Sequence, residues 1–187
     1  MRHFFRYLLL IFLFIFSLES TITVTNTNDS GAGSLREAVA TANTTPDTIE
    51  FDSSLSGQTI TLSSSLNITS AYTIDGGSNN LTIETTGNYR VFFIDHSGTS
   101  TLYDLSLQNG VSLGGKAWKG EFTYLGGGGL GAGGAIFVKE GNLIIKGISI
   151  SNCSVYGGDG VNNSVIVLNQ GGGGGGGYGY WKWWLSS

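Results

Sequence analysis

The strand-like sequences VFFI (residues 91–94) and LSLQN (residues 105–109) each have a counterpart farther along the chain. AIFV (135–138) follows VFFI at an offset of 44 residues, and ISISN (148–152) follows LSLQN at an offset of 43 residues. LSLQN and ISISN alternate apolar and polar residues, which is the period of a strand with one buried face. Because both sequences recur in the same order and direction at nearly one spacing, the chain is predicted to be a repeat protein whose equivalent strands stack.

Shorter β-branched runs separated by polar turns fill most of the chain before residue 110. Looser alignments of Leu62 with Glu84 and of Asp75 with Asp95, which are 22 and 20 residues apart, predict coils of about 20–24 residues. The fold is therefore predicted to be all-β, a parallel β-solenoid. A sandwich or an antiparallel barrel would instead need hairpin turns about every 8–12 residues. The expected strands are Thr21–Thr25, Thr48–Phe51, Thr59–Leu62, Tyr72–Asp75, Leu81–Glu84 and Arg90–Asp95.

One short helix near residues 34–43 is predicted from local signals. Ser34 and Glu37 have the spacing of a capping box, in which each side chain accepts a hydrogen bond from a backbone N–H at the start of the helix. Asn43 is a suitable stop, and Pro46 lies just beyond it. The helix is expected to cover the open end of the stacked strands. Its apolar stripe consists of Leu35, Ala38, Val39 and Ala42.

Residues 1–20 are predicted to be a signal peptide. Arg2 and Arg6 form a basic start, and residues 8–18 (LLLIFLFIFSL) are apolar except for one serine. This apolar segment is shorter than an ordinary membrane span of about 20 residues, and an uncleaved anchor is the alternative. The chain is therefore expected to be exported. Cys153 is the only cysteine, so the chain forms no internal disulfide.

Glycine is distributed unevenly. The chain holds 31 glycines, and the windows 110–134 and 157–179 hold 11 each. These tracts predict a Gly-rich loop at 111–134 and a Gly-rich, aromatic tail at 157–187 with little ordered structure, whereas residues 21–156 are expected to form the solenoid. Charged residues make up 12% of the chain and the net charge is −4, which argues against binding to nucleic acid.

Residues 23–38 (TVTNTNDSGAGSLREA) resemble the CSLREA motif that opens many bacterial surface proteins with a right-handed parallel β-helix. A second element, GGAI, is similar to one found in polymorphic outer-membrane proteins and related autotransporter passengers. The resemblance implies a protein of the cell surface, the outer membrane or the extracellular space with an adhesin-like role, and a structural role for the two elements. Their residues are Ser34, Leu35, Arg36 and Glu37 in the first element and Gly133, Gly134, Ala135 and Ile136 in the second.

The resemblance also bears on the end of the chain. Such passengers are long solenoids with a carboxy-terminal barrel or another anchor, whereas here Gly171–Gly177 are followed by YGYWKWWLSS (178–187). This change of composition predicts a truncated or frameshifted product, or a fragment of a longer passenger. The alternative is an aromatic tail that docks at a membrane interface or on a partner. Membrane association would depend on an anchor that is missing or unidentified.

Parallel β-helices also include polysaccharide lyases and hydrolases, which need two or three acid–base groups on one strand face. Asp75 and Asp95 would stack on neighbouring coils, but each lies just before a turn, where aspartate commonly caps the backbone. No catalytic residue, metal or cofactor is therefore predicted. The glycine pattern at 129–134 leads into a strand rather than a helix, and Asp159 alone cannot supply a calcium site. The other groups considered are Glu84, Asp104, Arg90, Lys146 and His96.

Three aromatic residues in the first glycine-rich loop are the predicted binding residues. Trp118, Phe122 and Tyr124 are expected to contact a glycan or a host protein, and the alternative is that they pack on the solenoid surface. An exposed last coil favours self-association. The predicted function is adhesin-like display by a non-enzymatic exported protein. A carbohydrate-active enzyme and a truncated remnant without independent function are the alternatives.

Overall fold

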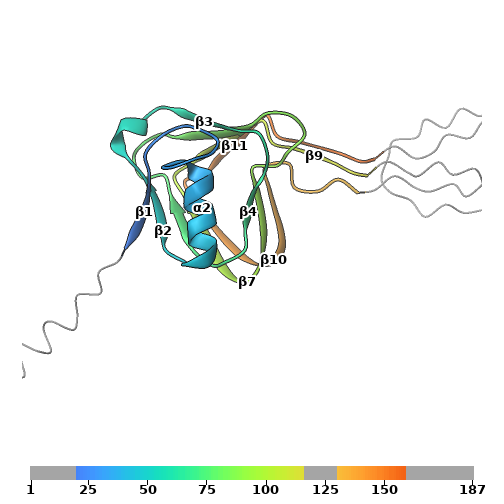
Figure 1. Ribbon diagram of the computed structural model, residues 1–187. Helices are drawn as coiled ribbons and strands as arrows, with labels where there is room; N and C mark the ends of the chain where they lie inside the picture. Colours follow the sequence, from blue (N-terminus) through green and yellow to red (C-terminus); the bar gives the residue numbers. More distant parts are fainter. Residues whose placement is uncertain (1–19, 116–129, 159–187) are drawn as a thin grey trace, which may run out of the picture.

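The computed structural model describes residues 20–115 and 130–158 (Figure 1). Within these ranges the chain is mostly β, with twelve strands, the helix α2 (Leu35–Thr44) and the short 3₁₀-helix η1 (Ser53–Leu55). No helix in the same ranges combines the length and the apolar character that crossing a membrane requires. The predicted signal peptide, apart from Ser20, and nearly all of the predicted tail lie outside the described residues.

The strands form three sheets, and every strand pair in them is parallel. This pairing agrees with the predicted all-β class and excludes an antiparallel sandwich or barrel for the described residues. The first sheet has the order β1 (Thr21–Val24), β2 (Thr48–Phe51), β5 (Thr73–Asp75), β7 (Phe92–Tyr103) and β10 (Ile136–Lys146), and β4 (Leu66–Ile68) also pairs with β7. The second sheet has the order β3 (Thr59–Leu62), β6 (Thr82–Thr85), β8 (Ser106–Gln108) and β11 (Ser149–Ser151). The third sheet contains β9 (Val111–Leu113) and β12 (Ser154–Tyr156).

The two long repeat offsets predicted from the sequence are confirmed by the register of the strands. In the first sheet Phe92 pairs with Ile136, at an offset of 44 residues. In the second sheet Ser106 pairs with Ser149, at an offset of 43 residues. Because neighbouring parallel strands lie about 4.8 Å apart, equivalent side chains of the two repeats stack directly on each other.

The two shorter alignments are wrong. Glu84 pairs with Thr61 rather than with Leu62. Asp75 pairs with Tyr103, and Asp95 pairs with Glu140 instead. The reason is that β7 is continuous: its first residues pair with β4 and its last residues pair with β5, so Asp95 belongs to a different part of the sheet from Asp75.

The corners that lead into the second sheet share one backbone conformation. Each of its four strands is preceded, two residues earlier, by a residue with positive φ. Only glycine, asparagine and aspartate adopt this left-handed conformation readily, so the residue type at each corner is restricted. The four residues are Gly57 (φ 70°), Asn80 (φ 47°), Asp104 (φ 49°) and Gly147 (φ 64°).

The core consists of stacked aliphatic side chains from the first and second sheets. Ile74 of β5 pairs with Leu102 of β7, and Ile83 of β6 pairs with Leu107 of β8; all four side chains are fully buried. Burial of each such side chain contributes about 1.5–3 kcal/mol. These inner residues alternate along the strands with Thr, Ser, Glu and Gln, and the inner face is apolar except for the buried Thr85 at the end of β6.

The helix α2 closes the end of the core beside β1, β2 and β4 (Figure 1). All four residues of its predicted apolar stripe are buried. The Ser34 hydroxyl accepts a hydrogen bond from the Glu37 N–H, as predicted, but the Glu37 carboxylate accepts from the Gly33 N–H at 2.7 Å. The reason is that the Ser34 N–H already donates to the Gly31 carbonyl.

Asn43 lies in the last turn of α2, which ends one residue later, and it does not stop the helix. Its side-chain amide donates to the Asn67 carbonyl, and its side-chain carbonyl accepts from the Thr69 N–H, both at 2.8 Å. These are the hydrogen bonds that a further strand would make with β4. Asn43 therefore satisfies backbone groups of the β4 segment that faces the helix.

Candidate functional site

The predicted binding residues Trp118, Phe122 and Tyr124 lie outside the described residues. Val111–Leu113, which the sequence assigns to the start of their loop, form strand β9 and pair with β12. The loop thus begins after Leu113, next to a paired strand. Gly-rich sequence alone did not reveal this strand.

A polar cleft of about 360 Å³ opens on the first sheet, where β1, β2 and β5 lie side by side. No residue of the cleft was singled out from the sequence. Because its walls come from three segments that are far apart in the chain, only the sheet order brings them together. The lining residues are Thr21, Pro46, Asp47, Thr48, Glu50, Ala71, Tyr72 and Thr73.

Threonine hydroxyls form a ladder along this cleft. Thr21 pairs with Thr48 across β1 and β2, and Thr73 pairs with Thr101 across β5 and β7. Thr48 and Thr73 each precede an isoleucine, and those two isoleucines pair with each other. Since the isoleucines are buried, the threonines lie on the opposite, outer face of the strands.

Tyr72, Asp47 and Glu50 supply further hydrogen-bonding groups to the lining of the cleft. Tyr72 is largely buried, and its hydroxyl donates to the Asn43 side chain at 3.3 Å. Burial raises the pKa of Tyr72, so the hydroxyl stays protonated. The Asp47 carboxylate accepts from the Thr48 N–H at 2.8 Å, and the Glu50 side chain is exposed. The cleft therefore presents hydroxyls and carboxylates, and no basic side chain lines it.

The acidic residues considered for catalysis occupy structural positions. Asp75 accepts from the Gly77 N–H at 2.8 Å, which is a turn-forming bond. Asp95 accepts from Lys139 at 2.7 Å, and this bond raises the pKa of Lys139. Asp104 occupies one of the left-handed corners. The structure does not bring Asp75 and Asp95 together as a pair.

Glu84 is also held by protein groups. Its two carboxylate oxygens accept from the Thr61 hydroxyl at 3.0 Å and from the Asn109 amide at 2.8 Å. Thr61 belongs to the neighbouring strand β3 and Asn109 to the corner after β8, so Glu84 ties neighbouring strands of the second sheet together. A carboxylate that accepts two such bonds is poorly placed to serve as a general acid.

His96 and Ser100 form a contact that the sequence does not suggest. The His96 Nε2 atom lies 2.8 Å from the Ser100 Oγ atom, and His96 Nδ1 accepts from the Gly98 N–H at 3.0 Å. In the neutral imidazole the proton is therefore on Nε2, which donates to Ser100. A base that activates a serine must accept its proton, so this pair lacks the arrangement of a nucleophilic serine.

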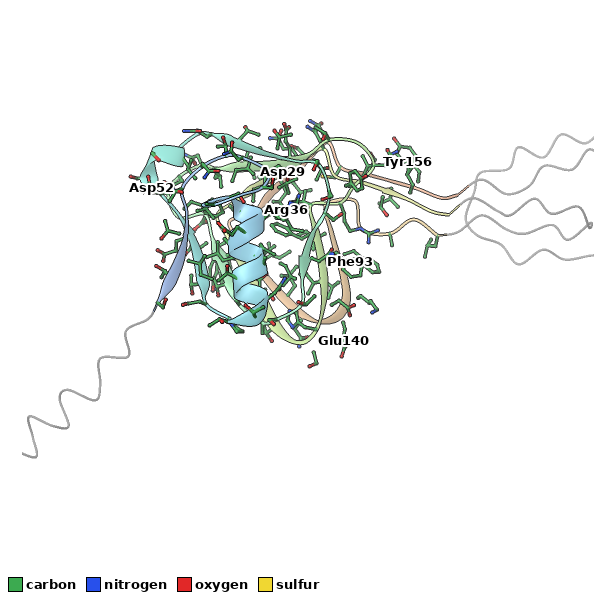
Figure 2. All side chains as sticks on the ribbon, in the orientation of Figure 1. Asp29, Arg36, Asp52, Phe93, Glu140 and Tyr156 are labelled. Atoms are coloured by element: carbon green, nitrogen blue, oxygen red, sulfur yellow. The ribbon has the colours of Figure 1, made fainter. Side chains whose placement is uncertain are left out.

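Arg36 joins three segments at the start of α2. Its guanidinium lies 2.6 Å from the Asp29 carboxylate and donates to the carbonyls of Ser64 and Ser65 at 3.0 and 3.2 Å (Figure 2). The Ser63 hydroxyl also donates to Asp29. Burial raises the pKa of Asp29, but the bonds from Ser63 and Arg36 together with the Arg36 charge outweigh burial and lower it. The role of Arg36 is thus structural and extends beyond the helix cap.

The GGAI element positions the start of β10. Gly133 has positive φ, and a side chain at Gly134 would approach the Ser154 carbonyl to 2.6 Å. The Ala135 carbonyl accepts from the N–H groups of Val91 and Phe92 at 2.9 and 3.0 Å. Ile136 then begins the strand. Both glycines are therefore needed where the chain returns to the first sheet.

An aromatic pair flanks this element. The rings of Phe93 and Phe137 stack with centroids 5.7 Å apart, and the Arg90 guanidinium lies 4.9 Å from the Phe137 centroid. Arg90 also donates to the Ser112 hydroxyl at 2.8 Å and to the Ala132 carbonyl at 3.2 Å. Ala132 is therefore tied to Arg90 and to Ser112 of β9, where the chain leads into the GGAI element.

No protein-family model, curated protein or solved structure matches this chain. Among the described residues, no three His, Cys, Asp or Glu side chains are grouped so that they could hold a metal ion. The polar cleft between β1, β2 and β5 is the candidate ligand-binding site among the described residues.

Proposed function

We propose that the chain is an exported, non-enzymatic bacterial surface protein with an adhesin-like role, built on a right-handed parallel β-helix of the CSLREA kind. Three features support this fold: parallel pairing in every sheet, strands that recur in one order, and left-handed corners at equivalent positions. Connections between parallel strands of one sheet are right-handed in nearly all proteins, which supports the proposed handedness. The apolar segment at 8–18 supports export to the cell surface, the outer membrane or the extracellular space.

The observation that carries the functional part is the threonine ladder beside the polar cleft. Thr48 and Thr73 present hydroxyls at the spacing of neighbouring strands, and Glu50 and Asp47 add carboxylate acceptors. Sugars have many hydroxyl groups that both donate and accept hydrogen bonds, and such groups match this lining. We therefore propose that the cleft binds a glycan.

The engaged acids support a non-enzymatic role. Asp75, Asp95 and Glu84 each have a protein partner, so none of them is available as a free acid–base group. The one observation that favours a carbohydrate-active enzyme instead is the presence of Asp47 and Glu50 in the same cleft. Glycosidases use such carboxylate pairs.

Trp118, Phe122 and Tyr124 are proposed as a second contact for the same glycan or for a host protein. In the chain these three residues lie between β9 and β10. Ala132, which accepts a hydrogen bond from Arg90, lies between them and β10. Aromatic side chains often contribute most of the binding free energy of an interface when they pack into a well-ordered contact.

Glycan-array binding by the full chain tests the proposal for the cleft. The double variant Thr48→Val and Thr73→Val removes two hydroxyls while keeping the side-chain shape, and we expect binding to weaken about tenfold. Thr59→Val with Thr82→Val is the matched control, because these residues pair with each other on the second sheet. Equal binding by both double variants would overturn the proposal, and release of shortened glycans that Glu50→Gln abolishes would favour the enzyme.

Replacing residues 116–129 with a short Gly-Ser linker tests the loop separately. This change leaves β9 and the GGAI element intact, since both lie outside the replaced range. We expect weaker binding to cells or matrix with unchanged thermal unfolding. Unchanged binding would remove Trp118, Phe122 and Tyr124 from the proposed function.

A further inference from the structure

The strands β10, β11 and β12 are the last ones that the structure describes in their sheets, and their apolar side chains are left uncovered. Ile145, Ile150 and Val155 are 46%, 51% and 47% exposed. Their register partners on β7, β8 and β9 are buried, which shows that the three side chains occupy core positions. Among the described residues, no strand pairs with the outer edge of β10. Such an edge binds a further strand readily.

The offset between successive strands at this end of the molecule is nearly constant. Ser106 pairs with Ser149, and Val111 pairs with Ser154, each at an offset of 43 residues. The second half of β10 pairs with β7 at the same offset, and Ile136–Val138 at the start of β10 pair with β7 at an offset of 44. Adding 43 residues to the segment 135–138, which contains the start of β10, leads to residues 178–181 (YGYW).

The glycines before β10 agree with this offset. A side chain at Gly131 would clash with the Tyr156 carbonyl, and one at Gly134 would approach the Ser154 carbonyl to 2.6 Å. The residues 43 positions later are glycines too: Gly174 for Gly131, Gly176 for Gly133 and Gly177 for Gly134. An offset of 44 would instead place Tyr178 at the position equivalent to Gly134.

The aromatic residues agree as well. With an offset of 43, Tyr180 corresponds to Phe137, whose ring already stacks on Phe93 at 5.7 Å. Trp181 corresponds to Val138, which is 38% exposed. A strand with this register would extend the aromatic stack on its outer face and place an indole over an uncovered side chain on its inner face.

We propose that residues 178–181, which lie outside the described residues, add a parallel strand to the outer edge of β10 and so cover it. The occupant of this edge is the chain's own tail. The sequence alone predicts a tail with little ordered structure that docks, if at all, on a membrane or a partner. The strand register supplies the reason to place these four residues on β10 instead.

Hydrogen exchange of the full chain tests this proposal directly. We expect the amides of 178–181 to exchange at least about tenfold more slowly than those of the preceding Gly171–Gly177, because paired backbone groups are protected. Sedimentation at the same protein concentration shows whether the chain is a monomer or a dimer under the conditions of the exchange experiment. Equal exchange in the two segments would overturn the proposal. Protection that appears only where dimers form would also overturn it, by assigning the edge to a second copy.

The variant Tyr180→Pro removes a backbone N–H from the proposed strand, and Ser186→Pro is the control outside it. We expect Tyr180→Pro to abolish the protection of 178–181 and to increase acrylamide quenching of tryptophan fluorescence, while Ser186→Pro changes neither. Unchanged exchange in α2 establishes that both variants are folded. Identical exchange of 178–181 in the two variants would contradict the proposal.

Discussion

The Arg36 guanidinium lies 2.6 Å from the Asp29 carboxylate, and this ion pair joins the loop before α2 to the helix itself. Arg36 also reaches the carbonyls of Ser64 and Ser65, between β3 and β4, so that the helix, the loop and the turn are held at one point. Each side chain of the pair is less than one-third exposed. The contact is therefore better shielded from solvent than an ordinary surface ion pair.

Replacing Arg36 should destabilise the protein. Arg36→Ala removes the ion pair and leaves carbonyl groups without their donor, and we expect a loss of about 1–3 kcal/mol in the free energy of unfolding. Arg36→Lys should give an intermediate loss, because lysine keeps the charge without the planar array of donors. Urea unfolding measures both. An Arg36→Ala variant as stable as the parent would contradict the structural role of this residue.

Asp29 should make stability depend on pH in the acid range. Because its pKa is lower in the folded protein than the ordinary value of 3.8, its contribution is present above pH about 4 and is lost as the pH falls through the folded pKa. Asp29→Asn should therefore be less stable than the parent near neutral pH and lose less stability on acidification. Urea unfolding between about pH 2 and about pH 7 measures this difference. Parallel pH curves for the two proteins would refute it.

The cap of α2 should be sensitive to the residue at Ser34. Ser34→Ala removes the acceptor for the Glu37 N–H and should cost about 0.5–2 kcal/mol. Ser34→Gly should cost less, since glycine is tolerated at this position of a helix. Thermal unfolding of the two variants distinguishes a cap effect from a general loss of packing. If loss of packing were the cause, Ser34→Gly would be less stable than Ser34→Ala.

Gly134 should not tolerate a side chain. Gly134→Ala places a Cβ atom 2.6 Å from the Ser154 carbonyl oxygen, a clash with backbone that we expect to cost about 1–3 kcal/mol. Gly115→Ala is the matched control, because a Cβ atom there meets nothing within 4 Å. Denaturant unfolding of the pair tests the packing of the GGAI element on β12. Equal stability of the two variants would show that this packing is absent in solution.

The sequence predicts those parts of the fold that depend on local patterns. The helix is marked by Ser34, Glu37 and a stripe of small apolar residues, and the long offsets are marked by runs of inner aliphatic side chains that recur almost unchanged. In the first repeat the inner residues that carry the pattern, such as Phe92, Ile94 and Leu107, are buried, and their counterparts in the second repeat pair with them in register. Phe92 and Ile136, for example, are paired in the predicted register.

Features that depend on the path of the chain were not predicted. His96 and Ser100 would lie about 13 Å apart on a straight strand, but they are in contact because β7 bends between them. Asp95 lies just after the part of β7 that pairs with β4, whereas Asp75 of β5 pairs with Tyr103 at the other end of β7. The polar cleft was missed for a similar reason, since its residues share no motif and meet only through the order of β1, β2 and β5.

The corner residues show a signal that sequence reading could have used. Asn80 and Asp104 look like ordinary turn residues when each is taken alone. Both lie two residues before a strand of the second sheet, as do two glycines. A search for Gly, Asn or Asp two residues before each run of alternating apolar and polar residues would have identified the four corners from the sequence.

Strands of the second sheet stay in register although the lengths of chain between them differ. Thr82 pairs with Ser106 across 24 residues, and Ser106 pairs with Ser149 across 43 residues. The additional residues lie in the chain between β9 and β10, and the strands that follow keep their pairing. That junction is consequently a natural insertion point for protein engineering, where foreign peptides or recognition loops of different lengths can be grafted onto a scaffold that remains unchanged.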